Sequence, residues 1–229
     1  MPLPELNLEY VDSWRTAPTG IDLLRMLKYG EGTKIYGGDP YRVIYGGQQY
    51  KGPLDKHPRI LVDKGGYKSD ATGPYQIQST TWDEAKNALG LEDFSPLSQD
   101  RAAIYLAARK LRQFDQSFPE LAATGMTPLH MENLADVWAP LPNREGKSWY
   151  NQPVKPYDEL LGVYNQRSLD EAKQREAVDL SENWLTKVSP FLEGLKNMNP
   201  FKKEEKKSTV IPPLPPIPNE ITTYGGNYE

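Results

Sequence analysis

The stretch TGIDLLRMLKYGEGTKIYGG, residues 19–38, decides the fold and sets one carboxylate apart from its neighbours. Its apolar residues recur at helical spacing up to Gly30, which is a stop signal, so it predicts a helix over about 20–29 and then a glycine-rich turn. Glu31 follows this helix and lies between two glycines. A carboxylate at a helix C-terminus faces the negative end of the helix dipole, which disfavours its charged form.

Glu31 can be interpreted in two ways. It is either a surface residue in an ordinary turn or a general acid. A helix C-terminus and an apolar cleft both raise the pKa of a carboxyl group. A raised pKa is what a general acid needs near neutral pH. Placement alone does not decide between the two interpretations.

The composition excludes several classes of protein. The chain has 229 residues and a formal net charge of -4, which argues against general nucleic-acid binding. It has no cysteine, so disulfides and thiolate metal sites are excluded. No apolar run approaches the roughly 20 residues that span a bilayer, and we expect no membrane span. The N-terminus MPLPELNLEY lacks the pattern of a secretory signal.

Helix signals continue along the chain, so we expect a mostly helical α+β domain over 20–165, preceded by an N-terminal arm over 1–19. STTWDEAKNALG, SPLSQDRAAIYLAARKLRQF and TPLHMENLADVWAPLP each combine a cap with an apolar stripe. YRVIYGG is a short β-like run that ends in a turn, and it predicts a small, loop-rich β portion. Trp82 and Trp138 lie on predicted helix faces, where core packing is their expected role.

The chain changes character after residue 165. Residues 166–200 predict an amphipathic helix with Ala177, Leu180, Trp184 and Val188 on one face. Residues 201–229 combine a charge run with the proline-rich segment VIPPLPPIPNE, which favours polyproline II. We interpret this extended helical and proline-rich tail as an anchor to a protein partner.

A second group of residues suits a neutral polar ligand such as a sugar. Glycine lets a ligand approach the backbone, aromatic rings stack, and amides form hydrogen bonds. A phosphate ligand would instead call for arginines and a glycine-rich phosphate loop. The candidate binding residues are Thr33, Gly73, Tyr75, Gln76, Gln78, Gln99, Trp149, Tyr150 and Gln152.

We expect no metal and no cofactor. His57 and His130 are the two histidines of the chain, and they do not form a ligand-spaced pair. His57 is more typical of a loop residue that is hydrogen-bonded to the backbone than of a catalyst.

An ordered set of motifs resembles a known family. EGT after a helix, YRVIYGG, DKHPR, ATGPYQIQSTTWD, GLEDFSPLSQD and VWAPLP occur in this order. Together they resemble the lambda-type phage lysozymes, which are lytic transglycosylases, over roughly residues 20–155. The resemblance implies a lysozyme-like fold, a catalytic role for Glu31 and a saccharide cleft at Tyr75 and Gln76. Gly30 departs from the small hydroxyl residue expected before the glutamate, and the tail departs from the family's compact enzyme.

The resemblance implies cleavage of the MurNAc–GlcNAc bond of peptidoglycan by one glutamic acid, with formation of 1,6-anhydro-MurNAc. One alternative is a hydrolase, which needs a second carboxylate from Asp55, Asp63 or Asp70. Another is a structural virion protein whose lysozyme-like domain only binds glycan.

The tail indicates where such an enzyme would be found. A compact enzyme released by a holin has no need of it, so it predicts a virion-associated enzyme bound to a phage structural protein. The alternative is a free endolysin that waits in the host cytoplasm for holin release.

Overall fold

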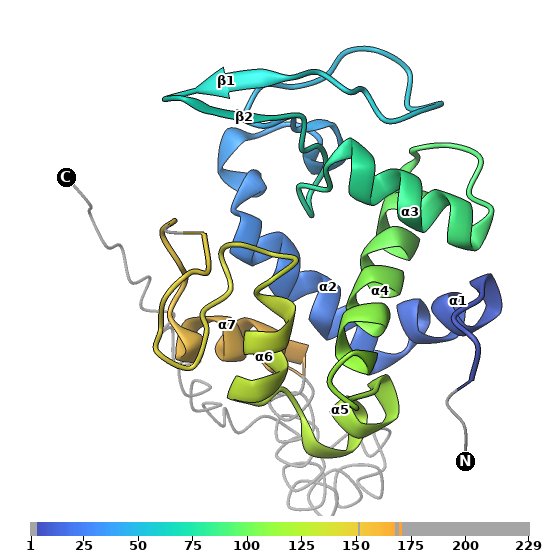
Figure 1. The fold of residues 1–229 in the computed structure, drawn as a ribbon, viewed down its shortest axis with the longest axis vertical. Helices are drawn as coiled ribbons and strands as arrows, with labels where there is room; N and C mark the ends of the chain where they lie inside the picture. Colours follow the sequence, from blue (N-terminus) through green and yellow to red (C-terminus); the bar gives the residue numbers. More distant parts are fainter. Residues whose placement is uncertain (1–3, 151, 168–169, 171–229) are drawn as a thin grey trace, which may run out of the picture. The chain divides into compact units, whose positions relative to one another are not determined.

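The computed structural model describes residues 4–150, 152–167 and 170, and Figure 1 shows their arrangement. The chain is mostly helical with one small antiparallel hairpin, which confirms the predicted α+β class. The helices are α1 (Leu8–Thr16), α2 (Pro18–Glu31), α3 (Ser79–Leu89), α4 (Pro96–Arg112), α5 (Phe118–Thr124), α6 (Pro128–Leu134) and α7 (Tyr157–Tyr164). Two short 3₁₀ turns are η1 (Thr33–Tyr36) and η2 (Pro40–Arg42).

Helix α4 forms the centre of the core, and α1, α2, α3 and α6 pack against it. It begins as predicted, because the Ser95 Oγ accepts a hydrogen bond from the Ser98 N–H and Pro96 occupies the first turn. Its small and apolar residues from Ala102 to Leu111 are almost fully buried, which lets the neighbouring helices approach closely. Trp82 and Trp138 are also buried in this core, as expected.

The β portion is small, as predicted, but its strands lie elsewhere. Strands β1 (Val62–Lys64) and β2 (Tyr67–Ser69) pair antiparallel around a turn in which Gly65 and Gly66 have positive φ. The predicted run at residues 41–47 forms only isolated bridges, in which Val43 pairs with Gln49 and Ile44 with Thr72. The hairpin was missed because its strands are short, polar and largely exposed.

The predicted N-terminal arm is wrong for residues 8–16, because they form helix α1 and pack on the domain. Val11 is fully buried, and the Trp14 ring stacks on Phe118 with centroids 5.2 Å apart. Asp12 also pairs with Arg101 of α4 at 2.6 Å. Helix α2 follows α1 after Ala17 and is longer than expected at both ends.

Helices α5 and α7 were not predicted. Helix α5 begins with a capping box between Ser117 and Glu120, in a segment too short for a clear apolar period. The predicted tail segments at 166–200 and 201–229 lie outside the described residues, apart from residues 166, 167 and 170. Within the described part of the chain, no helix is long and apolar enough to cross a membrane.

Candidate active site

Glu31 is the last residue of α2, so the structure confirms its predicted place at a helix end. Gly32 follows in the left-handed conformation, with φ of 64°, and its N–H donates to the Tyr29 carbonyl at 3.1 Å. This glycine lets the helix stop directly after the glutamate without steric strain.

The Glu31 carboxyl is half-buried and has no hydrogen-bond or ion-pair partner among the described residues. Burial raises the pKa of Glu31 to about 8, because the surrounding protein disfavours the charged form. The direction of this shift is the expected one, and burial is one of the two causes that the sequence suggested. A carboxyl group in this environment holds its proton at neutral pH and can donate it.

The helix turn that carries Glu31 is supported from behind by α7 and by the segment before it. A Cβ added at the buried Gly30 would lie 3.7 Å from Leu160, 3.8 Å from Leu141 and 3.9 Å from Pro140. The Tyr29 hydroxyl donates a hydrogen bond to the carboxylate of Glu159, which also pairs with Lys155. These contacts fix the position of the helix end.

Four of the candidate sugar-binding residues lie in the interior of the domain, whereas the sequence placed them on a cleft wall. Tyr75 and Gln99 are 1% and 0% exposed, Thr33 is 2% exposed, and Gly73 is buried. The Tyr75 hydroxyl donates to the Asp100 carboxylate at 2.5 Å, so its ring packs inside and offers no open face to a sugar. The Gln99 amide nitrogen donates to the Tyr41 and Phe94 carbonyl oxygens at 3.2 and 2.8 Å.

A glycine is required at position 73 for a structural reason. Its φ is 84°, and a Cβ at this position would lie 1.9 Å from the Oε1 of Gln99. The glycine therefore lets the 72–77 turn approach α4 closely.

The other candidate residues lie on partly or fully exposed segments. The Gln76 amide donates to the Gly73 and Val43 carbonyl oxygens at 2.9 and 3.2 Å, while Gln78 and Gln152 are exposed. Trp149 is 55% exposed and Tyr150 is 46% exposed. The Tyr150 hydroxyl donates to the Asp136 carbonyl at 2.5 Å, which ties its segment to the turn after α6.

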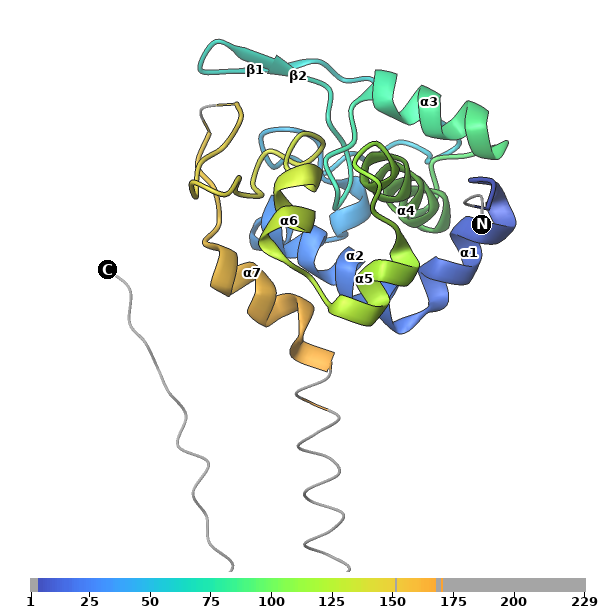
Figure 2. The ribbon, with the colours of Figure 1, turned by 60° about the horizontal axis from the view of Figure 1, so that its bottom comes forward.

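Figures 1 and 2 show how this segment lies in the fold. The connection between α6 and α7, drawn in yellow, lies on the same side of the domain as the β1–β2 hairpin. The C-terminal end of α2 lies next to both of them. The exposed aromatic residues of this connection therefore remain candidates for a ligand held near Glu31.

Asp55, Asp63 and Asp70, the candidates for a second carboxylate, have other surroundings. The Asp63 carboxylate accepts from the Gly66 N–H at 3.2 Å in the hairpin turn, and that of Asp70 accepts from the Ser79 N–H at 3.2 Å. Asp55 is exposed. Desolvation is the one cause of the raised pKa of Glu31, so none of these described carboxylates contributes to it.

The two histidines have structural partners. The His57 ring is buried and contacts the Ile77 carbonyl at 3.0 Å, and its Nδ1 accepts from the Arg59 N–H at 3.1 Å. This arrangement confirms the predicted backbone role. His130 closes the cap of α6 with Thr127. No group of three or more potential metal ligands is found among the described residues.

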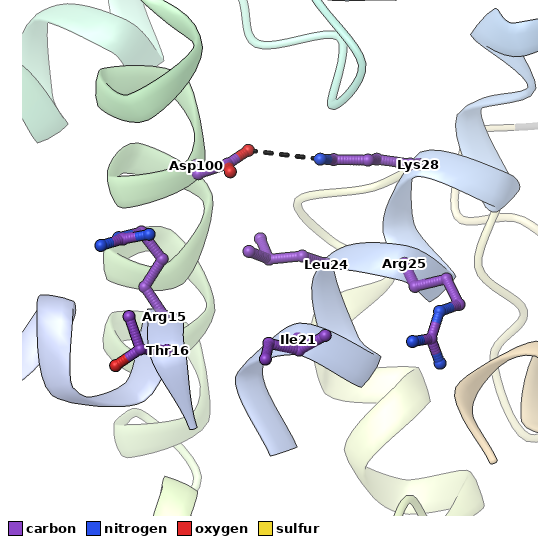
Figure 3. Close-up of a pocket in the computed structure, with 7 residues that line it drawn as sticks. All are labelled: Arg15, Thr16, Ile21, Leu24, Arg25, Lys28 and Asp100. Carbon is purple, nitrogen blue, oxygen red and sulfur yellow. Dashed lines mark ion pairs between the residues drawn. The ribbon is translucent and has the colours of Figure 1, made fainter. Parts of the chain in front are cut away.

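The structure also contains a groove that the sequence did not indicate (Figure 3). It measures about 530 Å³ and lies between α2, α4 and the end of α1. Its lining residues are Arg15, Thr16, Ile21, Leu24, Arg25, Lys28 and Asp100. Glu31 is not among them, so this groove is separate from the immediate surroundings of the carboxyl.

Comparisons with known proteins agree on one family. The family model described as Endolysin matches residues 21–169. The chain is 31% identical to the endolysin of Escherichia phage lambda over 150 residues, which cover 62% of this chain and 87% of the relative. It is also 31% identical to the endolysin of Escherichia phage P2 over 107 residues, covering 47% of this chain and 59% of the relative.

Solved structures give the same result. The lysozyme of bacteriophage lambda complexed with a chitohexasaccharide matches with a TM-score of 0.56 and 29% identity. The match covers 66% of this chain and 94% of that one. A second structure of the bacteriophage lambda lysozyme matches with a TM-score of 0.54 and 27% identity.

Proposed function

Because this chain belongs to the endolysin family, we propose that it is a lytic transglycosylase of peptidoglycan, with Glu31 as its acid and base. The observation that carries the proposal is the half-buried Glu31 carboxyl, which has no partner among the described residues. Its pKa of about 8 keeps it protonated at neutral pH. A protonated, unpaired carboxyl is free to donate to a leaving oxygen.

The reaction needs one carboxyl group and no added water. Glu31 donates its proton to the oxygen of the MurNAc–GlcNAc bond, and the bond from that oxygen to the muramyl C1 breaks. The resulting Glu31 carboxylate takes the proton of the muramyl 6-hydroxyl, whose oxygen bonds to C1 of the same sugar. The products are a GlcNAc end and a 1,6-anhydro-MurNAc end, and Glu31 regains its proton. Because the nucleophile belongs to the substrate, the entropic cost of recruiting water is avoided.

A hydrolase of the same bond is the alternative, and it requires a second carboxylate across the bond from the acid. The environment of Glu31 favours the transglycosylase. No carboxylate of the described residues contributes to its pKa, and the Asp63 and Asp70 carboxylates accept backbone hydrogen bonds elsewhere.

A glycan strand is the ligand that best fits the exposed residues near this helix end. Trp149 and Tyr150 present aromatic surface, and Gln76 has an amide on a partly exposed turn. Aromatic stacking and amide hydrogen bonds suit sugars. The chitohexasaccharide held by the related lambda lysozyme supports the same class of ligand.

The enzyme would act on the host cell wall, as a phage protein. The two relatives are endolysins, which favours a free enzyme released from the host cytoplasm. Attachment to a virion through the tail remains a prediction, because that tail lies outside the described residues. A chain shortened to residue 165 that cleaves peptidoglycan normally but is lost from purified particles would support attachment.

Substitution Glu31→Gln tests the proposal, because it keeps the shape of the side chain and removes the proton. We expect the initial rate on purified peptidoglycan to fall by about 10²–10⁴-fold or more. Glycan binding and the melting temperature should be retained. Glu92→Gln is the matched control, because Glu92 is exposed after α3, and it should keep the full rate. A Glu31→Gln enzyme with nearly full activity would remove Glu31 from the mechanism.

A further inference from the structure

Lys28 lies three residues before Glu31 on α2, which places the two side chains on neighbouring parts of the helix surface. Pairs of opposite charge at this spacing commonly attract one another. A lysine ammonium beside the Glu31 carboxyl would favour the ionised form. The sequence therefore contains a cation that could prevent Glu31 from acting as an acid.

The structure shows Lys28 bound elsewhere. Its Nζ lies 3.4 Å from the Asp100 carboxylate of α4 and donates to the Tyr41 hydroxyl at 2.5 Å. The same nitrogen lies over the rings of Tyr41 and Tyr75, 4.7 and 5.2 Å from their centroids. Figure 3 shows Lys28 extending from α2 towards Asp100 on α4.

The group that holds Lys28 is itself well connected. The Asp100 Oδ1 accepts hydrogen bonds from the hydroxyls of Tyr75 and Tyr41 at 2.5 and 2.8 Å. Burial, and then the charge of Asp100, raise the pKa of both tyrosines, so their hydroxyls stay protonated and able to donate. Charge-assisted hydrogen bonds and cation–π contacts together make this a stable position for the ammonium.

Other charged groups on the elements packed against α2 leave Glu31 without a partner. The charged groups that form ion pairs there pair with residues other than Glu31, and Lys34 of η1 is exposed. The paired groups are Asp12 and Arg15 of α1, Asp22 and Arg25 of α2 itself, Asp100, Arg101, Arg109 and Lys110 of α4, Glu120 of α5, Glu159 of α7, and Lys155 just before α7.

We propose that Asp100, Tyr41 and Tyr75 form a positioning site that holds the Lys28 ammonium away from Glu31. These residues act on Glu31 through Lys28. The inference rests on the proposed role of Glu31 as the acid, and it adds a reason why Glu31 can keep its proton beside a lysine.

Asp100→Asn is the main test, because the amide keeps an acceptor for both tyrosines but loses the charge that attracts Lys28. The released ammonium should pair with Glu31 and lower its pKa by about one unit or more. Two measurements report this: the pH at which kcat/KM declines, and a titration of the ¹³C-labelled Glu31 carboxyl by NMR. The NMR signal is assigned with Glu31→Gln and does not depend on activity.

Three further variants separate the effect of Lys28 from a general loss of charge. Lys28→Met alone should leave the pH midpoint of the Glu31 titration unchanged, because the wild-type ammonium is already held away from Glu31. Lys28→Met combined with Asp100→Asn should restore the midpoint that Asp100→Asn lowers. Lys34→Met is the matched control, because Lys34 follows Glu31 by three residues and is exposed, and it should change nothing.

Two results would overturn the proposal. In the first, the pH midpoint of the Glu31 titration is the same in Asp100→Asn as in the wild type. In the second, Asp100→Asn lowers this midpoint but the double variant does not restore it. A raised midpoint in Lys28→Met alone would also overturn it, since Lys28 would then already act on Glu31. If Asp100→Asn does not fold, Tyr41→Phe takes its place and should lower the midpoint in the same direction. If Glu31→Gln stays active, the proposed function fails, but the NMR titration still decides this inference.

Discussion

Two carboxyl groups, Asp100 of α4 and Glu31 at the end of α2, have opposite surroundings. Asp100, which meets the helix at Lys28, accepts hydrogen bonds from two tyrosines and pairs with a lysine. Glu31, at the end of the helix, has no partner among the described residues although it is half-buried. The first carboxylate holds elements of the fold together, whereas the second is left free to exchange a proton.

The difference indicates what each region contributes. A partly buried carboxylate with several donors, such as Asp100, stabilises one arrangement of its neighbours, and removing a partner is costly. A half-buried carboxyl without donors gains nothing from ionising, so it is a poor structural group and a suitable acid. Local exceptions to full pairing of this kind are expected at functional sites.

The largest expected effect is on the pH dependence of activity, which reports on Glu31. Glu31 must carry its proton to donate it, and burial raises its pKa to about 8. The value of kcat/KM should therefore hold from neutral pH to about 8 and then decline about tenfold for each further pH unit. Initial rates on purified peptidoglycan between about pH 6 and about pH 10 measure this. A value of kcat/KM that already falls about tenfold per pH unit between about pH 6 and about pH 8 would contradict the account.

The next largest effect is on stability and concerns Tyr75, which donates a hydrogen bond to Asp100. Because the ring is 1% exposed, Tyr75→Ala should lower the free energy of unfolding by about 3–5 kcal/mol. Tyr75→Phe removes only the hydroxyl that donates to Asp100 and should cost about 1–2 kcal/mol. Urea unfolding measures both.

Tyr67→Ala is the control for Tyr75, because Tyr67 is 61% exposed on β2 and should change the stability by less than about 0.5 kcal/mol. An intact Tyr75→Ala protein with unchanged stability and weaker glycan binding would contradict the structural role. It would return Tyr75 to the sugar-binding role that the sequence suggested.

The smallest effect concerns Gly30, which lies directly before Glu31. Gly30→Ala should stabilise the protein by about 0.5–1 kcal/mol, because alanine favours the helix and its Cβ would make ordinary contacts at 3.7–3.9 Å. Gly20→Ala is the contrast, because its Cβ would lie 1.9 Å from the Trp14 carbonyl oxygen and should destabilise the protein. Thermal unfolding compares them, and a destabilised Gly30→Ala would contradict the packing described around the helix end.

Much of the helical fold could be predicted from the sequence, because local signals determine helix ends. Ser95 with Pro96, and Thr127 with Pro128, cap α4 and α6 as expected. The β1–β2 hairpin could not be predicted, because its exposed strands carry no apolar alternation.

Of the candidate site, the place of Glu31 at a helix end could be predicted, because local signals determine where a helix stops. Tyr75 was misplaced because a loop residue gives no local sign of which way it points, and only its hydrogen bond to Asp100 on α4 shows that it faces inward. The ion pair between Lys28 and Asp100 joins residues 72 positions apart, so no local sequence pattern could predict it.

The central claim is that a single unpaired carboxyl, at Glu31, cleaves the glycan without water as the acceptor. Mass spectrometry of the muropeptides released from purified peptidoglycan tests this claim most directly. The account predicts fragments that end in 1,6-anhydro-MurNAc, each lighter by one water than the corresponding reducing fragment, and none from the Glu31→Gln enzyme. Fragments with ordinary reducing MurNAc ends from the wild-type enzyme would contradict it and would point to a hydrolase with a second carboxylate.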